Sequence, residues 1–236
     1  MDHWFQTIAA GSNLTASSVQ ALLNEGFVVI PGAIPDASLA GLANAYDHAV
    51  LNADPSDVGR GSTTTRVHDF VNRGPAFDEV YLNAPVLEAC CRVIGHPFKL
   101  SSLLARTLNP HKPPQKLHVD FPGDEQGWPM LGFILMVDEF RPENGATFFL
   151  LGSQGVEDPS EVSGSLVQAC GPAGSMILYN GSTWHGHAAN VTDHPRRSIQ
   201  GAYIRRTEKS ALDWSARMRV ETLDRIGPLA KYLLAL

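Results

Sequence analysis

The sequence contains little cysteine and no long hydrophobic run. Its three cysteines, Cys90, Cys91 and Cys170, form no CxxC pair, and adjacent cysteines rarely bridge each other, so we expect reduced thiols in a cytoplasmic protein. The longest apolar run, LGFILMV at 131–137, is too short to cross a bilayer. The first residues, MDHWFQTIAAGS, lack the basic and apolar regions of a signal peptide. These absences argue against a disulfide framework and against a membrane protein.

An excess of positive charge is also missing. The chain carries 18 Lys and Arg against 24 Asp and Glu, a net charge of −6, and it has no basic block. This balance argues against nucleic acid or an anionic membrane as the partner and leaves a small molecule. A hydrophobic content of 44% and a charged content of 18% are typical of a globular protein with a sizeable core. Since no linker interrupts the chain, we expect one domain over 1–236.

Helical patterns dominate the first part of the chain, and short apolar segments follow after Pro97. We expect helices over 15–26, from 36 onwards and, with an interruption near Pro85, over 75–95, with a short strand at 27–30. Turn signals separate the later segments and predict an α+β fold with a β-sandwich or barrel core. The expected strands lie near 98–108, 115–121, 130–138, 146–151, 174–180 and 197–205. An apolar helix in the tail, 208–236, could cover this core or pair with a second subunit, so both a monomer and a homodimer stay open.

Residues 53–74 are polar and contain Arg60, Arg66 and Arg73. Such a composition is typical of a solvated surface loop. The alternative is a lid, mobile without substrate, whose arginines meet an anionic substrate; on this hypothesis Arg66 binds substrate.

A His-x-Asp pair stands in the segment QKLHVDFP. On a strand, side chains two residues apart point to the same face, so His118 and Asp120 would leave it together. About 60 residues later, TWHGHAANVTDHPRRS offers His185 and, eleven residues further, Arg196. Two histidines and a carboxylate suit Fe(II) with positions left open for O₂ and a bidentate co-substrate. A dicarboxylate co-substrate needs a guanidinium at its far end. A His-x-Asp pair alone is weak evidence, because it also occurs as a surface pair.

Over nearly its whole length the chain resembles the phytanoyl-CoA dioxygenase family of Fe(II)/2-oxoglutarate oxygenases. Within that family the likeness is strongest to the branch of compact proteins called phytanoyl-CoA dioxygenase domain-containing. The resemblance is carried by EGFVVIPGAIPDASLAGL, LHVD, FILMVDEFRPENGATFFLLGSQ and GSMILYNGSTWHGHAANVTDHPRRS. It implies a double-stranded β-helix, or jelly roll, with flanking helices. It also implies that Fe(II) is held by His118, Asp120 and His185, and that Arg196 binds the far carboxylate of 2-oxoglutarate. The implied reaction hydroxylates a small molecule with O₂ and releases succinate and CO₂.

The same resemblance leaves some assignments open. His187 and Arg197 have nearly the spacing of His185 and Arg196, although Asn190 and Thr192 match the family pattern that begins at His185. Asp120 favours hydroxylation over halogenation, because a halogenating relative would typically have a small residue there. The family often has His where this chain has Gln154, and a polar residue where it has Val119.

Other residues are candidates for the pocket walls. The resemblance suggests Arg106 and Thr147 as contacts of the co-substrate, although both could be ordinary strand residues. Val119 and Trp128 could line an apolar substrate pocket, or Trp128 could be a plain core aromatic.

Two other functions remain: a degenerate family member that binds metal or 2-oxoglutarate without turnover, and a non-oxidative cupin-type metal enzyme. The intact set of His118, Asp120, His185 and Arg196 argues against the first, and Arg196 argues against the second.

Overall fold

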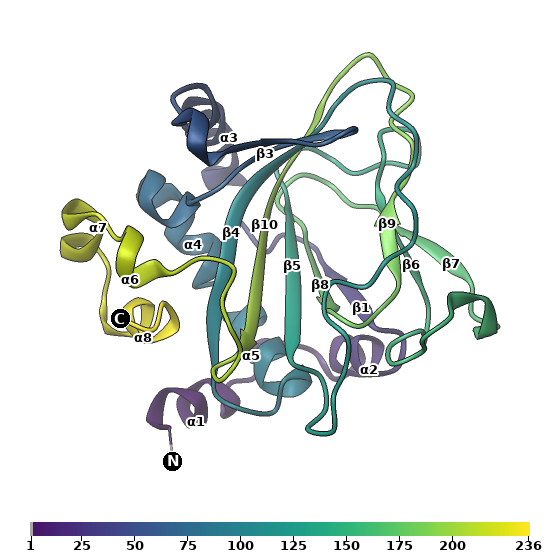
Figure 1. Ribbon diagram of the computed structural model, residues 1–236, viewed down its shortest axis with the longest axis horizontal. Coiled ribbons are helices and arrows are strands. Elements are labelled where there is room, and N and C mark those ends of the chain that lie inside the picture. Colours follow the sequence, from purple (N-terminus) through teal and green to yellow (C-terminus); the bar gives the residue numbers. More distant parts are fainter. Residues whose placement is uncertain (1) are drawn as a thin grey trace.

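The computed structural model, which describes residues 2–236, contains two antiparallel sheets (Figure 1). The major sheet has the order β1 (Phe27–Ile30), β8 (Met176–Asn180), β5 (Met130–Met136), β10 (Arg196–Arg205), β4 (Phe98–Leu108), β3 (Thr64–Val67) and β2 (Val58–Arg60). The minor sheet has the order β7 (Leu166–Ala169), β6 (Thr147–Leu150) and β9 (His185–His187). The sheet core expected from the short apolar segments is therefore present. The strands β2, β3, β7 and β9 were not predicted from the sequence.

The strand β5, which lies between β8 and β10, is buried on both faces, and its alternate residues enter two different cores. Leu131, Phe133 and Leu135 belong to the core between the major sheet and the helices. Ile134 and Met136 belong to the core between the two sheets, where Phe27 of β1 stacks on Phe149 of β6 with ring centroids 4.4 Å apart. A strand covered on both sides reads as a continuous apolar run, which explains LGFILMV.

Helices cover the outer face and the end of the major sheet. Before the first long strand they are α1 (His3–Ala9), α2 (Ala16–Asn24), α3 (Asp36–Leu51), α4 (Asp78–Tyr81) and α5 (Ala84–Val93). Short 3₁₀ turns η1 (Pro55–Asp57), η2 (Phe70–Arg73), η3 (Pro75–Phe77) and η4 (Pro159–Glu161) connect elements. The helix α5 packs on the sheet through Val86, Ala89, Cys90 and Val93. None of the helices in residues 2–236 is long and apolar enough to span a membrane.

The tail forms three short helices rather than one. They are α6 (Trp214–Arg217), α7 (Val220–Arg225) and α8 (Pro228–Leu233). The break between α7 and α8 falls at Gly227-Pro228, where proline opens a new helix because it cannot donate the hydrogen bond that continues the old one. The tail is fixed to β4, since the indole nitrogen of Trp214 donates to the carbonyl of Leu100 at 2.8 Å.

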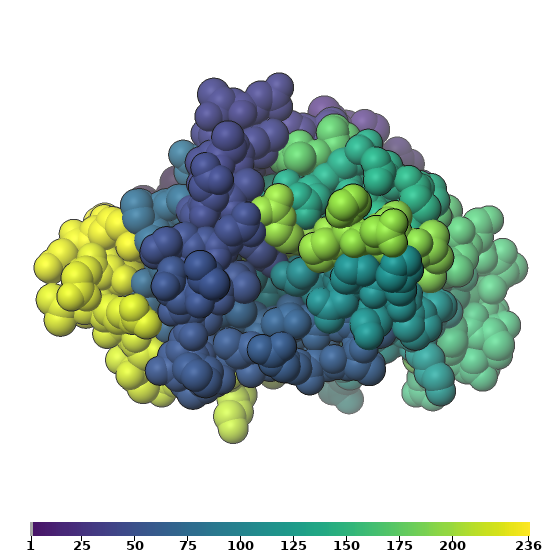
Figure 2. Space-filling view, turned by 90° about the horizontal axis from the view of Figure 1, so that it is seen from above, coloured from purple at the N-terminus to yellow at the C-terminus, as the bar shows by residue number. Residues whose placement is uncertain are grey.

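One end of the molecule is built from three segments that are far apart in sequence. The β2–β3 hairpin touches the segment after β4, where the amide of Asn109 donates to the carbonyl of Thr63 at 3.0 Å. That segment in turn pairs with the chain before β10 through a bridge between Lys112 and Asn190. Figure 2 looks down on this face, with the dark-blue hairpin region, the teal segment and the lime segment together.

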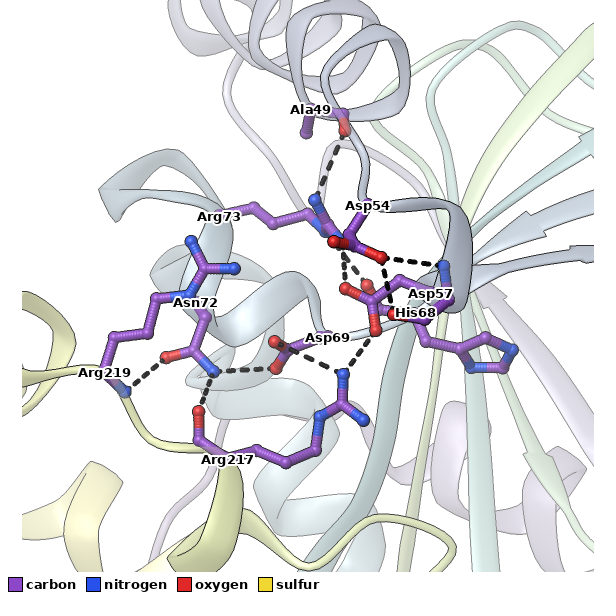
Figure 3. A network of polar contacts seen from close by, with 10 residues as sticks. Ala49, Asp54, Asp57, His68, Asp69, Asn72, Arg73, Arg217 and Arg219 are labelled. Carbon is purple, nitrogen blue, oxygen red and sulfur yellow. Dashed lines mark hydrogen bonds and ion pairs between the residues drawn. The ribbon is translucent and has the colours of Figure 1, made fainter.

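The interpretation of 53–74 as a solvated polar loop is wrong for most of its length. The segment adds β2 and β3 to the edge of the major sheet, and a polar network holds its base to the tail (Figure 3). Buried Asp57 accepts from Arg73 at 2.7 Å and also from Arg217. Asn72 donates to Asp69 at 2.8 Å and to the carbonyl of Arg217 at 3.0 Å. Arg73 is therefore an internal ion-pair partner and does not face a substrate.

The expected strand at 115–121 is absent as a regular element. Pro113, Pro114 and Pro122 flank the segment, and proline lacks the amide that a sheet ladder requires. A single bridge joins His118 to His185 of β9, with each amide donating to the other carbonyl at 3.0 Å. The backbone is extended enough at that point to place His118 and Asp120 together.

Candidate metal centre and its two cavities

His118, Asp120 and His185 form one cluster. Their candidate ligand atoms all lie within 4.8 Å of one another. The Nε2 atom of His118 is 3.7 Å from Oδ1 of Asp120, and the Nε2 atom of His185 is 3.6 Å from Oδ2 of the same carboxylate. Two imidazole nitrogens and one carboxylate converging on one point can hold a divalent transition metal.

Backbone carbonyls orient both imidazoles. The Nδ1 atom of His118 lies 3.1 Å from the carbonyl of Lys116, and the Nδ1 atom of His185 lies 2.9 Å from the carbonyl of Thr183. An Nδ1–H that donates to a carbonyl leaves the lone pair of Nε2 free for a metal. Burial lowers the pKa of His185, although the charge of Asp120 opposes this, so that the neutral ligand form is favoured.

A buried phenol holds the carboxylate. The hydroxyl of Tyr179, on β8, donates to Oδ2 of Asp120 at 2.6 Å. Burial raises the pKa of Tyr179, and the nearby charge of Asp120 raises it further, so the phenol keeps its proton. Its ring lies directly over Gly132 of β5, where a Cβ atom would come within 2.1 Å of the ring. Gly132 thus makes room for the side chain that orients Asp120. Sequence reasoning missed Tyr179, since an aromatic in an apolar strand reads as core.

His187 does not belong to the cluster. Its Nε2 lies 3.0 Å from the hydroxyl of Thr63, and its Nδ1 lies 2.8 Å from the carbonyl of Ala188. Burial lowers its pKa to about 4. Both ring nitrogens are therefore occupied, and the geometry favours His185 over His187 as the distal ligand.

The adjacent arginines of β10 point to opposite sides. Arg197 forms ion pairs at 2.7 Å with both Asp138 and Asp47, outside the site. Arg196 is 2% exposed, and its Nε and Nη1 have no partner in residues 2–236. Its guanidinium lies 3.8 Å from the ring centre of Phe140. Burial lowers the pKa of Arg196 to about 9, and the charge of Arg106 adds to this.

The motif between His185 and Arg196 builds the turn that delivers this arginine. The side-chain amide of Asn190 donates to the carbonyls of Asn109 and His194, at 3.2 and 2.9 Å. Its oxygen accepts from the hydroxyl of Thr192 at 2.7 Å. Asn190 and Thr192 thus have a structural explanation that needs no ligand.

Arg106 lies between the cluster and the edge of the sheet. Its guanidinium donates to the side-chain oxygens of Gln200 at 3.2 Å and Gln115 at 3.1 Å. Burial lowers the pKa of Arg106 to about 10, and the charge of Arg66 lowers it further. Gln115 and Gln200 carried no signal in the sequence, because glutamine is common at surfaces.

Two cavities adjoin the cluster. The inner one has a volume of about 50 Å³ and is lined by Asp120 and His185 as well as by Arg196 and Thr147. The outer one has about 410 Å³ and includes Arg66 in its wall. The two cavities share four lining residues, Arg106, Asp120, Tyr179 and Gln200.

Two of the expected pocket residues lie elsewhere. Val119 and Trp128 are not among the described residues that line either cavity. Val119 is next to both ligands, and on extended backbone its side chain points to the opposite face. The Trp128 ring packs against the backbone of Gly123 and Gly155, where a Cβ atom would collide with it. Their expected role in binding substrate finds no support in this geometry.

Comparisons with known proteins identify a matching family. A model of the family "Phytanoyl-CoA dioxygenase (PhyH)" matches residues 23–198. Dioxygenase af480 of Aspergillus fumigatus is 28% identical over 167 residues, which is 67% of this chain and 54% of the relative. Iron/alpha-ketoglutarate-dependent dioxygenase okaE of Penicillium ochrochloron is 26% identical over 197 residues, which is 74% of this chain and 65% of the relative. The chain thus spans about half to two thirds of the length of these two curated relatives.

Solved structures show the same fold. The non-heme alpha ketoglutarate dependent epimerase SnoN from nogalamycin biosynthesis superposes with a TM-score of 0.70 at 22% identity, covering 83% of this chain and 85% of that one. EctD from S. alaskensis superposes with a TM-score of 0.72 at 18% identity, covering 86% and 85%. The expected α+β jelly roll is confirmed. Because the family model covers residues 23–198, the chain belongs to the phytanoyl-CoA dioxygenase family.

Proposed function

We propose that this protein is an Fe(II)- and 2-oxoglutarate-dependent dioxygenase that hydroxylates an unactivated carbon of a small organic molecule. One observation carries the proposal. The buried guanidinium of Arg196 has no anionic partner in residues 2–236, and it lines the same small cavity as Asp120 and His185. A buried cation without a counter-charge is costly, and an anionic ligand that also reaches the metal supplies one.

The donor set fits Fe(II). His118, Asp120 and His185 would hold the metal through two imidazole nitrogens and one carboxylate, a donor set that suits Fe(II) and is too small to fill its coordination sphere. When bound, iron with 2-oxoglutarate and O₂ supplies the oxidant, and the co-substrate leaves as succinate and CO₂. The relative okaE is named for both iron and alpha-ketoglutarate, and SnoN has been solved with Fe³⁺ and alpha ketoglutarate.

The chain's own residues position the reactants. Arg196 binds the far carboxylate of 2-oxoglutarate, and Thr147, which is 4% exposed and lines the inner cavity, completes that subsite. Tyr179 keeps Asp120 directed at the metal through its hydrogen bond. Leu104, Met130 and Ile204 form apolar parts of the outer wall, where they exclude water from the reacting carbon. With Asp120 present, hydroxylation is favoured over halogenation.

Anaerobic titration of the purified protein with Fe(II) and 2-oxoglutarate, followed by visible absorption, tests the proposal. We expect a weak metal-to-ligand charge-transfer band that is lost in His118→Ala. In Arg196→Ala the 2-oxoglutarate Kd should rise roughly 10–100-fold, because charged hydrogen bonds are lost. His111→Ala and Arg197→Gln are matched controls, because both residues lie outside the cluster and the inner cavity.

Two results would count against it. If neither iron nor 2-oxoglutarate binds, the three residues do not form a working metal centre and the proposal is wrong. If both bind but no succinate forms in air with any substrate tested, the protein is a binding member of the family. Product analysis completes the experiment, since solved relatives of this fold include an epimerase and a carbocyclase.

A further inference from the structure

The outer cavity is lined by one face of the major sheet. Residues alternate along a strand, so Ser102, Leu104 and Arg106 of β4 share that face. Arg66 of β3 lies directly opposite Arg106, and His68 follows just beyond the same strand. Lys209, from the chain after β10, completes the wall. The cavity volume of about 410 Å³ is that of a small-molecule site.

The charges around this cavity are unbalanced. Arg66, Arg106 and Lys209 line it, and among residues 2–236 the one carboxylate in its wall is that of Asp120, which is directed at the metal centre. Like charges directly opposite on paired strands repel, so the Arg66–Arg106 pair is unfavourable without a counter-ion.

The cations of this wall also lack anionic partners in residues 2–236. Within residues 2–236 neither Arg66 nor Lys209 forms an ion pair, and Arg106 is held by two glutamines. The chain has an excess of acidic residues, and arginines elsewhere, such as Arg73 and Arg205, are paired with carboxylates. The cations of this wall differ from them in having no such pair.

We propose that the substrate is an anionic small molecule and that Arg66, together with Lys209, binds its carboxylate or phosphate group in the outer cavity. The inference rests on the proposed function. Arg66 is exposed, at the open side of the cavity, whereas Leu104, Met130 and Ile204 provide apolar walls. The substrate is therefore an amphipathic molecule whose apolar part extends from the anionic end toward Asp120.

The test uses three probes of equal length: hexanoate, hexyl phosphate and the neutral hexanamide. Each is added anaerobically to the protein loaded with Fe(II) and 2-oxoglutarate, and the Kd is measured by calorimetry and by the shift of the charge-transfer band. We expect one of the anions to bind roughly tenfold more tightly than hexanamide, since a charged hydrogen bond is gained. The better of hexanoate and hexyl phosphate identifies the anionic group.

Variants locate the effect. Arg66→Gln should remove the preference for the anion, and Arg66→Lys should keep part of it. Arg60→Gln is the matched control, because Arg60 is on the same hairpin and does not line the outer cavity. Equal binding of the three probes, or no binding of either anion, overturns the inference while the charge-transfer band still supports the proposed function. A rise in the 2-oxoglutarate Kd of Arg66→Gln as large as that of Arg196→Ala would also overturn it, because Arg66 would then serve the co-substrate.

Discussion

At the scale of single residues, the cluster depends on groups that do not touch the metal. Asp120 is bonded by Tyr179, and both imidazoles donate to backbone carbonyls. Such supporting partners fix ligand orientation, and their loss commonly reduces metal affinity 10–100-fold.

Tyr179→Phe therefore should weaken Fe(II) binding by roughly tenfold while leaving the fold intact, because only the hydroxyl is removed. An anaerobic Fe(II) titration of the variant measures this. Tyr46→Phe is the control, since that hydroxyl bonds Thr107, outside the cluster. Unchanged iron affinity in Tyr179→Phe would mean that the phenol fills space only.

Sequence reasoning could find the ligands and could not find their supports. His118, Asp120, His185 and Arg196 stand at fixed spacings in the chain, so a pattern can identify them. Tyr179, Gln115 and Gln200 come from three separate segments and meet the site only in the folded protein. Val119 and Trp128 are close to His118 in sequence, but neither is among the described residues that line the two cavities, so their role in binding substrate stays a prediction.

At the scale of elements, the β2–β3 hairpin is held at its base by Asp57. This carboxylate is 5% exposed and accepts from two arginines, one near the hairpin and one in the tail. That the rest of the hairpin is mobile without substrate stays a prediction.

Asp57→Asn should lower the free energy of unfolding by about 3 kcal/mol, because it leaves Arg73 and Arg217 without their shared counter-charge. Urea unfolding at neutral pH measures the loss. Asp193→Asn is a control with an expected change below about 0.5 kcal/mol, since the Asp193–His111 pair is exposed. Equal effects of the two substitutions would show that the network is not stabilising.

Glu88 of α5 fixes the chain between α1 and α2. Burial tends to raise its pKa, but hydrogen bonds from the amides of Asn13 and Leu14 and from Arg92 lower the pKa overall. A lowered pKa stabilises the fold above the pKa of the unfolded chain, and this contribution is lost as the pH falls through the folded value.

Glu88→Gln should therefore be less stable than the parent at pH 7, by about 1 kcal/mol, because the charged acceptor is replaced by a neutral one. The difference should shrink as the pH falls from about 4.3, the pKa of glutamate in the unfolded chain, through the lower pKa of Glu88 in the folded protein. Urea unfolding at a series of pH values follows both proteins. A difference independent of pH would assign the effect to packing.

Element prediction succeeded where local sequence decides the structure. The strand β1 and the helix α2 are defined by adjacent apolar residues and by Gly26, which adopts φ +91°. It failed for β2 and β3, because their residues are mostly polar and the hairpin is joined to the sheet only through the pairing of β3 with the distant strand β4. Long-range pairing of this kind leaves no pattern in a short window.

At the scale of the whole molecule, the metal centre joins segments that are otherwise separate. His118 and Asp120 come from the chain between β4 and β5, and His185 comes from β9 of the other sheet. A metal that binds all three selectively stabilises the folded state.

Saturation with Fe(II) and 2-oxoglutarate under argon should therefore raise Tm, and a chelator should reverse the rise. At one hundred times Kd the gain is about 2.7 kcal/mol, or roughly 5–10 °C for a chain of this size. Differential scanning calorimetry measures the change. His111→Ala should respond like the parent, whereas a normal rise in His118→Ala would place the metal elsewhere.

The buried position of Arg196 on the ring of Phe140 favours anion binding but lowers the free energy of unfolding of the ligand-free protein. The guanidinium is buried and stacked on a ring before any anion binds, so we expect it to lose little conformational freedom on binding. Folding, however, must strip water from a charge that has no counter-charge until then. On the proposed function, Arg196→Met would make the empty protein more stable and would remove the group that binds 2-oxoglutarate. The core of the protein thus contains a buried charge that lowers the stability of the empty protein, and a bound anion would offset that cost.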